Sequence, residues 1–179
     1  MVFRELNRGW GTAIYSRNIP FDEIPLCEKY PGHAVGVAAS LQNGERLYLA
    51  SIHGYPDLAF PRLAHIMAEI LETFAGRSMI VGGDLNTARL AETVWPGRGH
   101  RQFWERIDNP GGNLIDCCHR INGREIQTIF RKGSVHPFQD DHLFISRDLG
   151  SRLETCDVID TQVTRTVSDH IPLYMELGV

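Results

Sequence analysis

One strongly amphipathic segment, residues 57–75, lies between two groups of short apolar runs, and this arrangement limits the folds that the chain can adopt. Its apolar side chains recur at intervals of three and four residues, which is typical of a helix that packs on a sheet. This stripe consists of Leu63, Ile66, Met67, Ile70, Leu71 and Phe74. Asp57 is predicted to cap the helix, Pro61 falls near its first turn, and Gly76 ends it.

Short β-like runs lie on both sides of this helix. They span residues 11–16, 34–39, 46–52, 78–81, 114–117, 126–130, 142–146, 157–161 and 171–177, with a shorter helix predicted at 101–107. Asn43 and Gly44 separate two of the runs and favour a tight hairpin, because both residues tolerate a positive φ. Strands outnumber helices, so the sequence predicts a layered α/β fold of the α+β type. The length of 179 residues is typical of a single domain, 1–179.

Composition excludes several classes of protein. The chain has 18 basic and 22 acidic residues and a net charge of −4, which argues against a strongly basic nucleic-acid-binding coat. No run approaches the roughly 20 apolar residues of a membrane span, and the first residues contain no signal peptide. The four cysteines show no CxxC spacing. We therefore expect a reduced, cytoplasmic protein without a membrane partner.

Polar residues gather where the apolar runs stop. Asp84 and Asn86 follow the run that ends at residue 81, after a Gly-Gly bend. In extended backbone, residues two apart point to the same side, so a carboxylate and an amide could converge on one ligand. Taken alone, the pair is explained more simply as an Asx-type turn after a strand.

Three further groups carry titratable side chains. His53 ends an apolar run and is suited to proton transfer near neutral pH. Asp141 opens a run and could orient a neighbouring imidazole. Asp169 and His170 precede the last run. The chain has no G-x-S-x-G, P-loop, G-x-G-x-x-G or H-E-x-x-H motif, so the set indicates metal-assisted hydrolysis by water rather than covalent catalysis.

Five segments occur in an order that resembles a known superfamily. They are GWGTAIYSR at 9–17, ASIHGYP at 50–56, GGDLNT at 82–87, QDDHLFISRDL at 139–149 and VSDHIPLYMEL at 167–177. Together they are similar to the deoxyribonuclease-like branch of the endonuclease/exonuclease/phosphatase superfamily. The resemblance implies two packed mixed β-sheets flanked by helices, with a site at one edge of the sandwich. It also implies a metal-dependent phosphoesterase, nuclease-like in that its substrate is a phosphodiester attacked by water.

The resemblance assigns roles to the acidic and amide residues. Asp84 would position or activate the attacking water and contribute to the metal site, and Asn86 would hold the scissile phosphate. Asp169 would lie near the metal ion, which is expected to be Mg²⁺ or Mn²⁺.

The resemblance assigns proton transfer and phosphate binding to two histidines. His53 corresponds to a candidate acid for the leaving oxygen. His170 would act as a base or a phosphate ligand, and Asp141 would orient it.

The superfamily pattern also implies two elements upstream of residues 9–17. These are an opening strand with a phosphate-binding Asn, and a strand end with a metal-binding Glu. Met1 falls just before the matched segment, and Glu5 and Asn7 lie in a different context, so neither role is assigned to them. We therefore expect an N-terminally incomplete sandwich. It would be either a fragment of a longer product or a homo-oligomer that covers unpaired strand edges.

Two functions stay open at this point. In the first, the remaining acids hold Mg²⁺ or Mn²⁺ and the chain hydrolyses a phosphodiester, with nucleic acid one candidate substrate. In the second, the chain is a catalytically inactive truncated scaffold, a binding or oligomerisation module of the same fold. Residues 98–104 mix basic and aromatic side chains that could contact nucleic acid, but an amphipathic helix with Phe103 and Trp104 buried is favoured.

Overall fold

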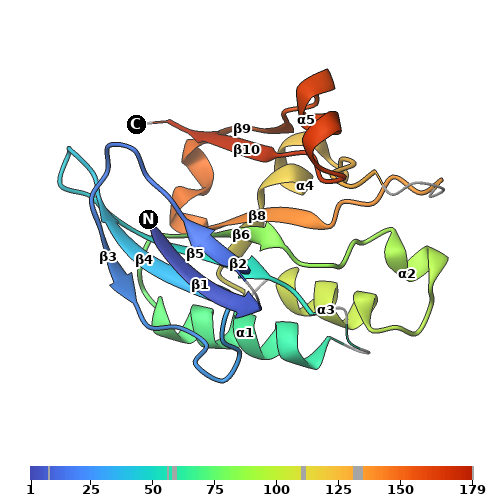
Figure 1. The fold of residues 1–179 in the computed structure, drawn as a ribbon, viewed down its shortest axis with the longest axis horizontal. Coiled ribbons are helices and arrows are strands. Elements are labelled where there is room, and N and C mark those ends of the chain that lie inside the picture. Colours follow the sequence, from blue (N-terminus) through green and yellow to red (C-terminus); the bar gives the residue numbers. More distant parts are fainter. Residues whose placement is uncertain (8, 56, 58–59, 110–111, 131–134, 179) are drawn as a thin grey trace.

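A six-stranded mixed sheet forms the centre of the molecule in a computed structural model, which describes residues 1–7, 9–55, 57, 60–109, 112–130 and 135–178 (Figure 1). In spatial order its strands are β3 (Phe21–Ile24), β4 (Ala34–Ser40), β5 (Arg46–His53), β6 (Met79–Asp84), β8 (Asp141–Ser146) and β7 (Leu114–Asp116). β5 and β6 run parallel, and the other neighbouring strands run antiparallel. The parallel pair brings the carboxyl ends of two central strands to the same edge of the sheet.

Two small sheets form a second layer over one face of the central sheet. They are the pair β1 (Val2–Asn7) and β2 (Trp10–Ile14), and the pair β9 (Leu153–Val158) and β10 (Leu173–Leu177). The first pair contacts β4 and β5, and β10 contacts β8. The predicted layered α/β fold is therefore confirmed, with its second layer divided into two two-stranded sheets.

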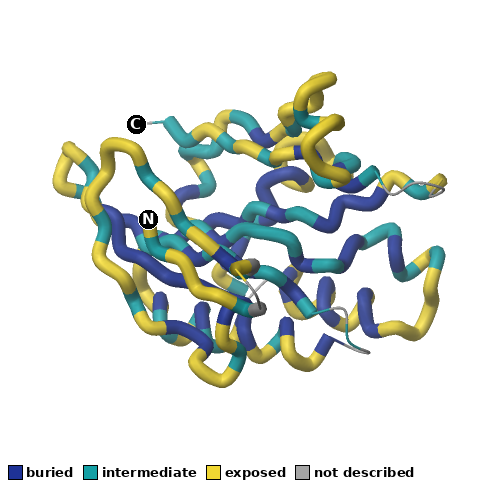
Figure 2. Tube along the Cα trace, in the orientation of Figure 1, coloured by how far each residue is buried: buried dark blue, intermediate teal, exposed yellow. Residues whose placement is uncertain are grey.

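The opposite face of the central sheet is covered by α1 (Pro61–Thr73), which lies along the bottom of Figure 1. Strand side chains alternate between the two faces. Ile52 and Phe144 pack in the cluster that contains the α1 stripe, whereas Leu47 and Ile145 pack in the cluster beneath β9 and β10. Figure 2 shows the central strands buried between these layers.

The helix of the amphipathic segment begins at Pro61, further along the sequence than predicted. Phe60, not Asp57, precedes the first helical residue, with a φ of 50° and no side-chain capping bond. Residues 58 and 59 lie outside the described part of the chain. Pro61 stands at the first turn and restricts the residue before it to non-helical backbone, so the helix begins at the proline.

Several shorter elements complete the fold. They are α2 (Ala91–Val94), α3 (His100–Ile107), α4 (Cys117–Asn122), the 3₁₀ helix η1 (Arg147–Arg152) and α5 (Gln162–Val167). Cys117 was predicted to end a strand but begins α4, because the Asp116 carboxylate caps that helix at the His119 N–H. The predicted helix at 101–107 is confirmed as α3.

Two strand predictions were wrong. Residues 126–130, all described, form no strand and contribute one isolated bridge between Ile129 and His170. The strand predicted at 157–161 ends at Val158, because residues 159–161 turn into α5, which Thr161 caps. The Asn43-Gly44 hairpin is confirmed: β4 and β5 are antiparallel neighbours, and Gly44 has a φ of 84°.

Self-association through strand edges depends on which strands of the second layer have an unpaired edge. Within the described residues, β2 and β10 each pair with one neighbour, and their second edges are unpaired. Homo-oligomerisation through these edges stays a prediction. No helix among the described residues has the length and apolar character needed to cross a membrane.

Candidate functional site

The register of the central sheet places three predicted site residues in one row. His53 at the end of β5 pairs with Asp84 at the end of β6, and Asp84 pairs with Asp141 at the start of β8. Directly paired residues point to the same face of a sheet, here the face that carries the second layer. The row forms because two parallel strands end where an antiparallel strand begins.

These three residues line a cavity of about 540 Å³, which we call the rim cavity. Its other walls come from β2, from β5 and β6, and from the turn before β10. Its lining residues are Gly11, Thr12, Ala13, Ser51, Ile52, His53, Gly83, Asp84, Asp141, Ser168, Asp169 and His170. The fold thus brings five of the six predicted site residues to one cavity, and their chemical roles remain predictions.

His170 is oriented by a carboxylate. Its Nδ1 lies 2.8 Å from Asp141 Oδ2. The hydrogen bond to Asp141 raises the pKa of His170 to about 9, so the imidazole is protonated at neutral pH when no other ion is bound. The segment around His170 is itself fixed, because Phe130 N donates to Asp169 O at 2.8 Å and Ile171 N donates to Thr128 O at 2.7 Å.

The pKa of His53 is shifted in the opposite direction from that of His170. Burial lowers the pKa of His53, although its Nδ1 lies 3.6 Å from Asp84 Oδ2. Burial also raises the pKa of Asp84, and the nearby carboxylate of Asp141 raises it further. In the absence of a cation, the cavity therefore holds a protonated His170, a neutral His53 and an incompletely compensated Asp84.

Asn86 does not line the rim cavity. Its backbone N–H donates to Asp84 Oδ1 at 2.8 Å, which is the Asx-type turn considered from the sequence. Its side-chain amide donates to Gly54 O at 3.3 Å and joins the loop after β6 to the end of β5. Asn86 has a φ of 53°, a left-handed conformation that asparagine tolerates better than most residues.

The rim cavity offers oxygen ligands that suit a hard divalent cation. Asp84, Asp141 and Asp169 all line it, but no cluster of three or more ligating side chains is preassembled among the residues that the structure describes. Mg²⁺ is commonly held by one or two carboxylates, with water and substrate phosphate filling the other positions. The raised pKa of Asp84 marks negative charge that a bound cation would stabilise. The residues present therefore fit Mg²⁺ or Mn²⁺.

Sequence reasoning missed Thr128, which connects two parts of the site. Thr128 is fully buried. Its hydroxyl accepts from the N–H groups of Asp140 and Asp141, both at 3.1 Å, and its carbonyl accepts from Ile171 N. One threonine thus fixes the start of β8 relative to the turn that carries His170. A single Thr in an apolar run gives no signal of this role in the sequence.

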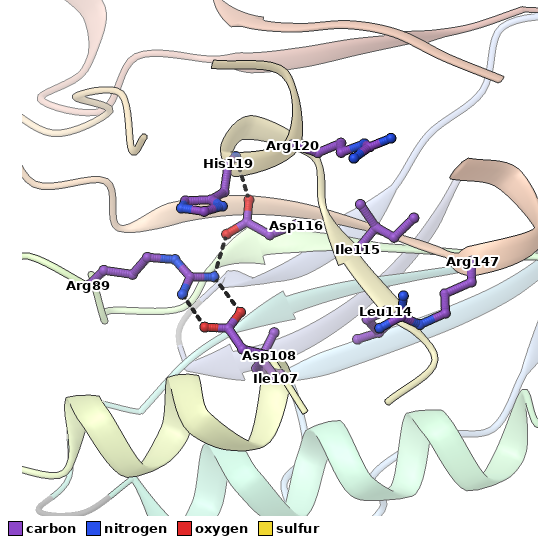
Figure 3. Close-up of a pocket in the computed structure, with 9 residues that line it drawn as sticks. All are labelled: Arg89, Ile107, Asp108, Leu114, Ile115, Asp116, His119, Arg120 and Arg147. Atoms are coloured by element: carbon purple, nitrogen blue, oxygen red, sulfur yellow. Dashed lines mark hydrogen bonds and ion pairs between the residues drawn. The ribbon is translucent and has the colours of Figure 1, made fainter. Parts of the chain in front are cut away.

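A second cavity of about 360 Å³ lies beside β7, between α3 and α4, and we call it the Arg89 cavity (Figure 3). The guanidinium of Arg89 binds both Asp108 and Asp116, the latter at 3.1 Å. It also lies 4.2 Å from the ring centre of Trp104. The Arg89 cavity contains none of the predicted site residues.

The basic and aromatic segment 98–104 is mainly structural. His100, Phe103 and Trp104 all belong to α3 and are buried. Arg98 and Arg101 are exposed. The favoured interpretation, an amphipathic helix with a buried aromatic face, agrees with this arrangement.

Comparison with known proteins identifies the fold. No protein-family model and no curated protein sequence matches the chain. Among solved structures, the endonuclease domain of TRAS1, a telomere-specific non-LTR retrotransposon, aligns with a TM-score of 0.68 and 18% identity over 93% of this chain and 72% of that one. An AP endonuclease from Archaeoglobus fulgidus aligns with a TM-score of 0.64 and 13% identity over 90% of this chain and 71% of that one.

A third structure carries the superfamily name itself. It is an endonuclease/exonuclease/phosphatase from Beutenbergia cavernae DSM 12333, with a TM-score of 0.67 and 20% identity. The alignment covers 89% of this chain and 46% of that one, so this chain spans less than half the length of that protein. Each of the five sequence segments that carry the resemblance contributes residues to the lining of the rim cavity. The chain therefore has the fold of the endonuclease/exonuclease/phosphatase superfamily.

Proposed function

We propose that the chain is a metal-dependent phosphodiesterase that hydrolyses its substrate by in-line attack of water. The observation that carries this proposal is the row of His53, Asp84 and Asp141, with His170 bound to Asp141 in the same cavity. The structural neighbours include proteins named as endonucleases, which supports a phosphodiester over other esters.

Asp84 and Asp169 are the proposed ligands of Mg²⁺ or Mn²⁺. Asp141, which pairs with Asp84 across the two strands, adds a third negative charge to the same cavity. When bound, the cation would stabilise negative charge on the phosphoryl oxygens during attack.

Side chains of the protein carry out the remaining steps. Asp84 orients the attacking water and accepts its proton with the carboxylate oxygen that faces His53, since its other oxygen accepts from Asn86 N. His170 binds a phosphoryl oxygen through the ring edge that Asp141 leaves free. His53 gives a proton to the leaving oxygen, and the negative charge of the bound phosphate supports its protonation.

Nucleic acid is the first substrate class to test. The net charge of −4 opposes broad electrostatic binding, so recognition would depend on local contacts at the rim cavity. Several structural neighbours are named as endonucleases, and one is named as bound to a DNA hairpin, which supports DNA as this first class; a mannosyl-6-phosphatase among the neighbours makes a small phosphoester the alternative.

The test is hydrolysis of bis(p-nitrophenyl) phosphate and of plasmid DNA by the 179-residue chain, with Mg²⁺, Mn²⁺ or EDTA in parallel. Asp169→Ala serves as the control for contaminating nucleases. We expect metal-dependent turnover that is lost with EDTA and in the variant. Absence of turnover together with absence of Mn²⁺ binding would contradict the proposal and favour an inactive scaffold, a binding or oligomerisation module.

A further inference from the structure

A chain of buried polar groups lies close in sequence to Asp84 and Asp141. It consists of Gln139, His142 and Thr87, whose exposed fractions are 0%, 0% and 1%. Gln139 Nε2 lies 3.0 Å from His142 Nδ1, and His142 Nε2 lies 2.9 Å from the carbonyl oxygen of Thr87. Nothing in the proposed reaction uses these groups, so their burial requires a separate explanation.

The partners define a single arrangement of protons. A carbonyl oxygen can only accept, so His142 Nε2 carries the hydrogen that it donates to Thr87. His142 Nδ1 then accepts from the Gln139 amide, whose oxygen accepts from Ile126 N at 2.8 Å. Each polar atom along this path has a partner, which holds His142 in one neutral tautomer and one orientation.

The hydrogen bonds connect the loop after β6 to the start of β8, and each of these segments adjoins a residue of the row. Thr87 directly follows Asn86 in the loop after β6, while His142 directly follows Asp141 on β8. Asp141 points into the rim cavity, so His142 points to the other face, where its ring lies 4.8 Å from that of Trp104. A second bond between the same segments, from Leu85 N to Asp140 O, measures 2.8 Å.

An apolar aromatic side chain could fill the space that His142 occupies beside Trp104 and Phe144. It would leave the Thr87 carbonyl and the Gln139 amide buried without partners, which is costly. Packing alone therefore does not account for a histidine here, whereas attachment of the loop to β8 does.

We propose that His142 is a positioning residue of the phosphodiesterase site. Its Nε2–H bond to Thr87 holds the loop after β6, which follows Asp84 and carries Asn86, against the strand that carries Asp141. The effect of His142 on turnover rests on the proposed function. The anchoring of the loop is a property of the fold and can be measured without any substrate.

Two polar substitutions separate the bond to Thr87 from the packing of the ring. The amide of His142→Gln reaches the position of Nε2 and can still donate to Thr87. The shorter amide of His142→Asn reaches the position of Nδ1, so it keeps the contact with Gln139 and loses Thr87. Phe144→Leu, on the same buried face of β8, controls for a general loss of packing.

The measurements are kcat and KM for bis(p-nitrophenyl) phosphate and hydrogen exchange at the Leu85 amide. We expect His142→Asn to lower kcat by about 10- to 100-fold with little change in KM, and His142→Gln to restore most of the rate. Leu85 should exchange faster in His142→Asn than in His142→Gln or in Phe144→Leu.

Equal kcat values and equal Leu85 exchange in the Asn and Gln variants would overturn the proposal. The proposal would also be overturned if the Leu85 amide exchanged as fast in Phe144→Leu as in His142→Asn, because the faster exchange would then result from a loss of packing. If the wild-type chain has no activity, the proposed function fails while the exchange comparison still decides whether His142 anchors the loop.

Discussion

The rim cavity and the Arg89 cavity both contain carboxylates, but they compensate negative charge in different ways. In the Arg89 cavity, one guanidinium binds Asp108 and Asp116 and stacks on Trp104. In the rim cavity, Asp84, Asp141 and Asp169 have two imidazoles as neighbours, of which burial disfavours the charged form of His53. Arg89 is protonated at any physiological pH, whereas a histidine can lose its proton.

The difference separates a structural ion-pair network from a candidate reaction site. The Arg89 network joins the loop after Asn86 to the end of α3 and to the cap of α4, and each of its two carboxylates contacts a permanent cation within the fold. The rim cavity keeps excess negative charge beside groups that can move a proton. Under the proposed function, this combination would bind a cation from outside the chain, and it is where chemistry with a phosphate is expected.

Asp84→Asn should produce the largest effect and should move activity and stability in opposite directions. We expect turnover of bis(p-nitrophenyl) phosphate to fall on the order of 1,000-fold, since the substitution removes a proposed metal ligand and the group that orients water. The melting temperature without metal should rise, because burial raises the pKa of Asp84 and the charged carboxylate is unfavourable there. A fall in melting temperature would show that the charge of Asp84 is structural.

Arg89→Met should show the reverse pattern. Removal of the guanidinium leaves the buried carboxylate of Asp116 without its charged partner, so the free energy of unfolding should fall by about 3 kcal/mol in urea denaturation. Turnover per folded molecule should stay near that of the wild type. Arg120→Met, at an exposed position of the same cavity, should change stability by less than about 0.5 kcal/mol. Equal effects of the two arginines would contradict a structural role for the Arg89 network.

Alkaline pH should weaken the pair of His170 and Asp141 while leaving the Arg89 network intact. The folded pKa of His170 is raised from 6.5 to about 9, so its stabilisation is complete below the unfolded value and is lost as pH rises through 9. In EDTA, the difference in unfolding free energy between wild type and His170→Gln should shrink by about 2 kcal/mol between about pH 6 and pH 10. A difference that stays constant over this interval would show that His170 is not stabilised as a cation.

Self-association should have the smallest effect and should act on one cavity alone. β2 forms a wall of the rim cavity, whereas the Arg89 cavity lies beside β7 at an edge of the central sheet. Pairing of a second copy with the edges of β2 or β10 should therefore lower specific activity modestly as concentration rises. Light scattering across a dilution series, read beside activity, tests this, and a monodisperse monomer at all concentrations would contradict it.

The sequence could predict the row of His53, Asp84 and Asp141 because each residue stands at the end or at the start of an apolar run. The stripe of α1 and the Asn43-Gly44 hairpin were predictable from local periodicity and turn chemistry.

Contacts between distant segments could not be predicted in this way. Thr128 acts through backbone groups of Asp140 and Ile171, and Arg89 acts through carboxylates 19 and 27 residues away. These partners meet only after the sheet has formed, so no local pattern in the sequence reports them. The start of α1 was mispredicted because the proline at residue 61 determined the boundary, not the polar residue before it.

The assignment of the rim cavity as a metal site is tested by Mn²⁺ binding, measured by the electron paramagnetic resonance signal of the free ion during titration. The wild-type chain, Asp84→Asn and Asp116→Asn would be titrated side by side in the absence of substrate. We expect saturable binding to the wild type, loss of that binding in Asp84→Asn, and its retention in the folded fraction of Asp116→Asn. Equal binding by wild type and Asp84→Asn, or no binding by the wild type, would contradict the assignment of the rim cavity as a metal-dependent site.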